Sequence, residues 1–92
     1  MATTINSGQG FEIVNVSAGG SAFLPVTFSQ DVNSVILQSR TAADFYVAKD
    51  STGTNYFTIK SGSSISLDVS GGAVACYVKG SGSQTIEALG AI

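Results

Sequence analysis

Short segments of the chain alternate between apolar and polar residues, and this period of two is typical of β-strands that bury one face. In residues 64–70, Ile65, Leu67 and Val69 fall on one face and the polar residues between them fall on the other. Similar segments, rich in Val, Ile, Phe, Tyr and Thr, occupy residues 11–17, 22–28, 32–39, 44–49, 54–60, 73–79 and 84–89. With residues 64–70 they predict eight short strands, and the pattern gives almost no support to a helix.

Glycine and small polar residues separate these segments, at residues 18–21, 50–54, 61–63, 70–72 and 80–83. Such residues favour tight turns, and we expect Gly53 in the left-handed region of backbone space. Loops this short join antiparallel strands, because a parallel crossover needs about a dozen residues or more. The pattern therefore predicts an all-β fold of about eight short antiparallel strands in a β-sandwich, with jelly-roll and immunoglobulin-like topologies both open.

Two local features refine this expectation. Pro25 lies inside the second expected strand. Because proline cannot donate a ladder hydrogen bond, that strand should be an edge strand or carry a bulge. A tight turn near Ala42 and Ala43 would pair residues 32–39 with residues 44–49 as a hairpin.

The chain has 92 residues, which is enough for one domain and too few for two. Hydrophobic residues make up 43% of it and charged residues only 11%, a balance that favours a folded core over disorder. We assign residues 11–92 to a single β-sandwich domain. Residues 1–10 are polar, with Ile5 as their apolar anchor, and we expect them to form a flexible N-terminal arm that orders on contact with a partner.

The composition removes most catalytic chemistry. The chain has no His, a single Cys and six acidic residues without apolar surroundings, so no base, activated nucleophile or metal-ligand set is evident. Cys76 lies between apolar neighbours and is interpreted as a small core residue. We therefore predict that the protein is not an enzyme, and we expect no catalytic residues, no metal and no cofactor.

Charge and hydropathy also exclude two kinds of partner. The four Lys and Arg residues and the net charge of −2 leave too few cations to neutralise a run of phosphates. Nucleic acid and anionic membranes are therefore not expected partners. The longest aliphatic run, residues 35–37, is far shorter than the ~20 residues that span a bilayer.

Low charge instead favours association with other protein chains. Tyr46 follows Phe45 and Tyr56 precedes Phe57, so in each pair one ring should point inward and the other outward. An outward Tyr is either a cross-strand partner or an interface anchor, and both remain open. Lys49, Lys60 and Lys79 end expected strands, where lysine protects strand edges or faces an acidic partner. The candidate interface residues are Ile5, Phe23, Pro25, Tyr46, Tyr56 and Tyr77.

The order of these segments resembles the small β-sandwich virion proteins of tailed bacteriophages. The resemblance spans residues 32–89 and rests on an apolar strand at 35–39, the strands at 43–47 and 54–59, a Gly-Ser turn into 64–68, and the strands at 73–78 and 84–89. It implies a capsid decoration or cement protein that bridges and stabilises subunits of the major capsid protein. A homotrimer on the capsid surface of the virion, made in the host cytoplasm and with residues 1–10 as its arm, is also implied. A tail or fibre accessory protein and a carbohydrate- or receptor-binding module are the alternatives.

Overall fold

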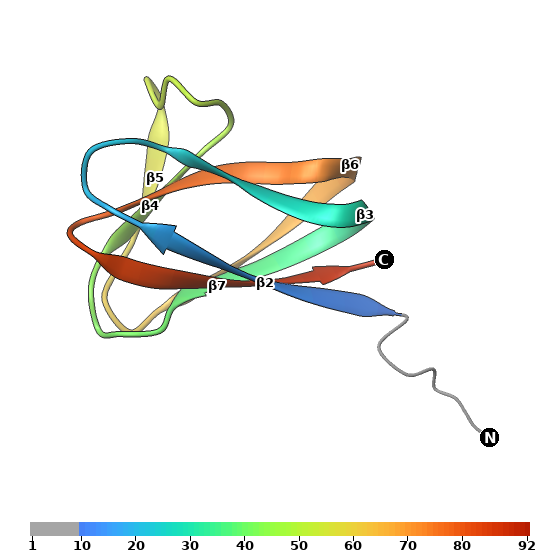
Figure 1. Cartoon of the computed structure of the whole chain (residues 1–92), viewed down its shortest axis with the longest axis horizontal. Helices are drawn as coiled ribbons and strands as arrows, with labels where there is room; N and C mark the ends of the chain where they lie inside the picture. The colour runs from blue at the N-terminus through green and yellow to red at the C-terminus, as the bar shows by residue number, and fades with distance from the viewer. Residues whose placement is uncertain (1–9) are drawn as a thin grey trace.

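The computed structural model of the chain describes residues 10–92, which form six antiparallel strands of one sheet (Figure 1). The strands are β2 (Phe11–Ala18), β3 (Leu24–Ser39), β4 (Phe45–Ala48), β5 (Tyr56–Ile59), β6 (Ser64–Gly80) and β7 (Gln84–Ala91), and their order in the sheet is β2-β7-β3-β6-β4-β5. The all-β antiparallel class expected from the alternation is confirmed. Ile5 and the rest of the expected arm up to residue 9 lie outside the described residues.

Six strands replace the expected eight because β3 and β6 each join two of the expected segments. β3 has 16 residues and β6 has 17, and each continues through a stretch whose polar or glycine residues predict a break. The two strands pair along most of their length, with register shifts between Val26 and Ser34. A paired strand therefore absorbs the break as a bend with bulges, which increase local twist.

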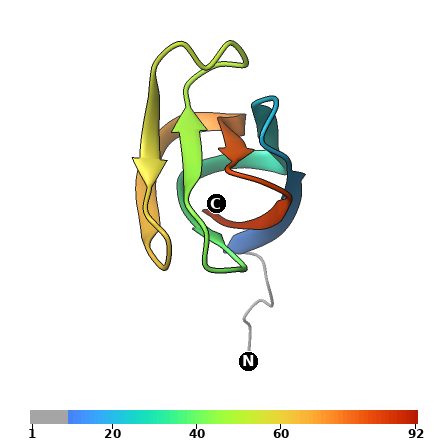
Figure 2. The ribbon, with the colours of Figure 1, turned by 90° about the vertical axis from the view of Figure 1, so that its left-hand side faces the viewer.

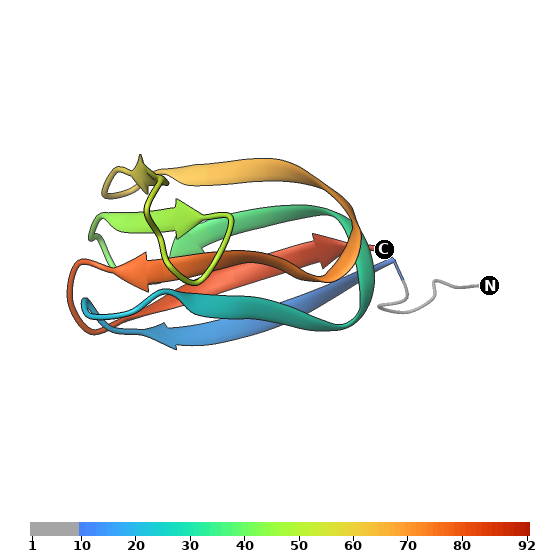
Figure 3. The ribbon, with the colours of Figure 1, turned by 90° about the horizontal axis from the view of Figure 1, so that it is seen from above.

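The bend divides the sheet into two halves that share one core. The first half-sheet consists of β5, β4, β6 residues 74–80 and β3 residues 24–28. The second half-sheet consists of β6 residues 64–69, β3 residues 32–39, β7 and β2. Figure 2 shows the strands arranged around a common interior, and Figure 3 shows both long strands curving at one end of the molecule.

The core is filled by inward side chains from both half-sheets, which belong to one apolar cluster. The largest fully buried side chains are Val26, Val32, Val35, Leu37, Phe45, Val78 and Ile86. Fully burying a side chain of this size contributes about 1.5–3 kcal/mol relative to leaving it exposed. The buried Gly90 of β7 makes room at the bend, since a Cβ there would fall 2.8 Å from the side chains of Phe28 and Val32.

The expected hairpin between residues 32–39 and 44–49 is wrong. β4 pairs with β5 and β6, whereas β3 residues 34–39 pair with β6 and β7, so residues 40–44 cross between the two half-sheets. The expectation for Pro25 is met: β3 residues 24–27 pair only with β6, and the register shifts directly after Val26. The ring of Pro25 therefore lies on an edge segment, where no donor is required.

Candidate interaction surfaces

Five of the six candidate interface residues come together on the outer face of the first half-sheet, although Phe23 is buried there at 9% exposure, and the sixth, Ile5, lies outside the described residues. Tyr77 of β6 stands opposite Pro25 on one side and Ala48 on the other, and Ala48 in turn stands opposite Tyr56. Directly opposite residues of an antiparallel pair project to the same face. The remaining two, Phe23 and Tyr46, lie against Tyr56 at ring-centroid distances of 6.2 Å and 5.3 Å.

Lys79 joins three of these rings into one cluster. Its ammonium group lies 5.0 Å from the ring centroid of Phe23, 5.6 Å from that of Tyr46 and 6.0 Å from that of Tyr56. Cation–π attraction acts at such distances, and Tyr46 meets Tyr56 edge to face, at an interplanar angle of 77°. We call Phe23, Tyr46, Tyr56 and Lys79 the aromatic–lysine cluster. The sequence predicts only that Lys79 ends a strand. Its place in the cluster follows from its pairing position opposite Tyr46.

Both Tyr–Phe pairs have one ring on the inner face and one on the outer face, as expected, but only the inner ring of the first pair is buried. Phe45 is fully buried and Tyr46 lies outside it, as alternation predicts. In β5, by contrast, Tyr56 and Phe57 are both exposed, at 56% and 64%. β5 is the edge strand of the first half-sheet, so the side of Phe57 that faces the interior is not covered.

A second surface crosses the outer face of the second half-sheet. Ile13 of β2 stands opposite Leu89 of β7, which stands opposite Ile36 of β3, and Phe11 lies on the same face as Ile13. Their exposed fractions are 60% for Ile13, 45% for Ile36 and Phe11, and 36% for Leu89. We call these four residues the outer apolar stripe. A shallow hollow of about 280 Å³ runs along it.

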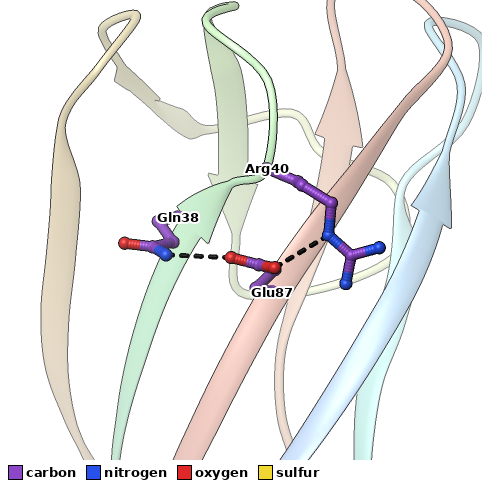
Figure 4. Close-up of polar contacts among 3 residues, drawn as sticks. All are labelled: Gln38, Arg40 and Glu87. Atoms are coloured by element: carbon purple, nitrogen blue, oxygen red, sulfur yellow. Dashed lines mark hydrogen bonds and ion pairs between the residues drawn. The ribbon is translucent and has the colours of Figure 1, made fainter.

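A charged group borders the outer apolar stripe, since Gln38 and Glu87 line the same hollow as its residues; Figure 4 shows this group. The Glu87 carboxylate accepts hydrogen bonds from Gln38 Nε2 and Arg40 Nε, both at 2.8 Å. Both bonds hold the pKa of the Glu87 carboxyl below its ordinary value, and the bond from Gln38 has the larger effect. Glu87 is paired with Arg40 in the same chain. A partner that covers the stripe would therefore meet no unpaired charge at this border.

The sequence prediction missed the outer apolar stripe, although the residues contain a signal for it. In β2, Val14 and Val16 pack toward the core while Phe11 and Ile13 lie on the opposite face. One face of such a strand covers the core. Its second apolar face stays exposed and is available for contact with another molecule. Alternation by itself indicates one core face, so it does not reveal a second apolar face.

Cys76 is buried, and burial raises the pKa of its thiol to about 11, which keeps it protonated and unreactive at neutral pH. Within residues 10–92, no three Cys, Asp or Glu side chains lie close enough together to hold a metal ion. The same residues include no helix of the length and hydropathy needed to cross a membrane.

No protein family, curated protein or solved structure matches this chain significantly. The role of the two surfaces therefore has to follow from their own geometry.

Proposed function

We propose that this protein is a non-enzymatic structural subunit of a virion, a decoration or cement protein that bridges and stabilises capsid subunits. The observation that carries the proposal is the outer apolar stripe. It places four large apolar side chains side by side on an outward sheet face, in a chain with only 11% charged residues. Contiguous apolar surface of this kind, with a paired charge at its border, is suited to contact with another protein.

The step from a contact surface to a virion protein rests on the resemblance to phage sandwich proteins. A protein that binds the assembled shell and not the free shell subunits stabilises the shell by mass action. Many copies on one particle add their contributions through multivalency. A tail or fibre accessory role would use the same stripe on a different part of the particle.

The proposal is tested on particles of the virus whose genome carries the gene. We expect particles assembled with the protein to release their nucleic acid at a higher temperature than particles without it. Ile13→Asp should weaken binding to the particle at least tenfold, because it places a charge in the stripe. Thr27→Asp adds the same charge to the outer face of the other half-sheet and should bind normally. Equal heat resistance with and without the protein would contradict the proposal.

A carbohydrate- or receptor-binding module is the second candidate, and the aromatic–lysine cluster favours it. Tyr56 is 56% exposed, and the Lys79 ammonium beside its ring supplies a donor. A glycan-array screen of the unmodified protein and of Tyr56→Ala distinguishes this candidate. Binding that Tyr56→Ala removes and Ile13→Asp retains would favour the module over the capsid protein.

A further inference from the structure

The two half-sheets have four edge segments; two of them are protected against pairing with another chain, and a third, β2, is tied to β3 at its first residues. β3 residues 24–27 carry Pro25 and a register shift, and β5 is only four residues long. At the start of β2, the Glu12 carboxylate accepts hydrogen bonds from Ser29 N at 3.2 Å and from Ser29 Oγ at 2.8 Å, which ties β2 to β3. Proline, bulges, short strands and covering contacts are the usual means of protecting edges.

The fourth edge, β6 residues 64–69, lacks these protections. Five consecutive residues, 64–68, pair in regular register with β3 residues 34–38. Within residues 10–92, no strand pairs with the other side of this segment. Its sequence contains no Lys, Arg or Pro, and Asp68 is its only charged residue. It therefore presents a regular row of backbone donors and acceptors to another extended strand.

An apolar groove lies beside this edge and adds a reason for it to be covered. The groove has a volume of about 390 Å³, and Phe57, Leu67, Val69 and Ala75 are among its lining residues. The exposed fraction of Phe57 is the highest among the large apolar side chains of the described residues. A strand added to the edge would project alternate side chains toward this groove, which is how strand addition combines backbone hydrogen bonds with apolar contacts.

We propose that two copies of the chain pair through β6 residues 65–69, antiparallel and across a two-fold axis at Leu67. This register places Leu67 opposite Leu67 and Ile65 opposite Val69 on the inner face. On the outer face it places Ser66 opposite Asp68 twice, so that each carboxylate can accept a hydrogen bond from a serine hydroxyl. The contact is isologous, with the same segment used by both copies.

The neighbouring registers are less favourable. Moving the axis to Asp68 would bring two carboxylates directly opposite each other, which is destabilising. Moving it to Ser66 would leave Val69 without an apolar residue opposite it. A segment of five residues is only ~17 Å long, so the buried area is below that of a standard interface and the dimer should dissociate on dilution.

Pairing of this kind is a property of the free protein and does not depend on the proposed function. It is tested by sedimentation velocity of the full chain from about 1 μM to 1 mM, with charge variants at the exposed Ser66. In the proposed register, Ser66→Lys faces Asp68 twice and should tighten dimerisation by several-fold to about tenfold. Ser66→Asp faces Asp68 twice and should weaken dimerisation by a similar factor.

Asn15→Lys and Asn15→Asp are the matched controls, because Asn15 is exposed on the same outer face but lies on β2, three strands away. They should leave the dimer unchanged and so separate the local pairing from the effect of net charge. A monomer up to 1 mM or a trimer would overturn the inference. So would a dimer that responds equally to charge at Asn15 and at Ser66.

Discussion

Gly53 shows what a single residue contributes to the aromatic–lysine cluster. Its φ of 63° lies in the left-handed region, and its N–H donates to the Asp50 carboxylate at 3.2 Å, so the turn has the form that the sequence predicts. The ring of Phe23 occupies the space that a Cβ at Gly53 would need. The sequence could not predict this contact, because it joins residues that are far apart in the chain.

We expect Gly53→Ala to destabilise the protein by roughly 2–4 kcal/mol, from backbone strain and from displacement of Phe23. Gly62→Ala is the matched control, since Gly62 also has a positive φ, 81°, but open space around it. Gly62→Ala should lose only the stability that backbone strain removes, about 1–2 kcal/mol. Urea unfolding of the two variants measures the difference, and equal losses would show that the Phe23 contact contributes nothing.

Glu87 gives the protein a dependence of stability on pH. Hydrogen bonds from Gln38 and Arg40 hold the pKa of Glu87 in the folded state below its ordinary value of 4.5. A depressed folded pKa stabilises the protein above the unfolded pKa, and this contribution is lost as the pH falls through the folded pKa. Glu87→Gln should therefore be less stable than the unmodified protein at pH 6, with a difference that shrinks toward pH 3.

Urea unfolding midpoints at pH 6, 5, 4 and 3 test this prediction. Asp31→Asn removes one exposed carboxylate from the bend of β3 and serves as the reference for a simple change in net charge. A difference between Glu87→Gln and the unmodified protein that stays constant over this range would argue against the hydrogen bonds of Gln38 and Arg40 as its source.

At the scale of elements, alternation located nearly all of the strand residues but not the continuity of the two long strands through their middles. Residues 29–31 of β3 are polar and residues 71–72 of β6 are glycine, so each stretch has the composition of a turn. Both remain in extended strands because each long strand has the other as its pairing partner around the bend. Whether such a stretch turns or bends depends on that distant partner, which local composition does not specify.

The candidate interface was partly predictable for a related reason. Alternation placed Tyr46 on an outer face correctly, since that decision needs only the neighbouring buried Phe45. It did not indicate that Phe57 is exposed, because exposure there depends on the position of β5 at the sheet edge. Strand order in this fold comes from pairings such as β2 with β7, whose residues are distant in the chain.

At the scale of the whole molecule, the aromatic–lysine cluster lies apart from the outer apolar stripe, whereas the β6 edge adjoins the stripe, with Ser66 directly opposite Ile36. The stripe and the cluster lie on opposite half-sheets, and the β6 edge lies beside the groove at the side of the molecule. A copy paired through β6 would keep its stripe free for a capsid, and the two stripes of a pair would bind together with the gain that multivalency gives. Edge pairing and capsid binding are therefore compatible.

The whole molecule should also open as one cooperative unit, and Cys76 can report this. Its side chain is 5% exposed in a core to which both half-sheets contribute, and burial raises the pKa of its thiol to about 11. At pH 8 and micromolar protein, a thiol reagent should therefore label Cys76 only through global unfolding. The logarithm of the labelling rate should then rise with urea concentration with the same slope as equilibrium unfolding.

Ser83→Cys in a Cys76→Ala background is the control, because Ser83 is exposed in the turn before β7 and should be labelled rapidly at all urea concentrations. A labelling slope for Cys76 well below the equilibrium slope would mean that part of the sheet opens by itself. Cys76 also borders the groove beside the β6 edge, so such opening would be centred on the side that lacks edge protection. Cooperative labelling would instead establish that the bend in β3 and β6 joins the two half-sheets into one folding unit.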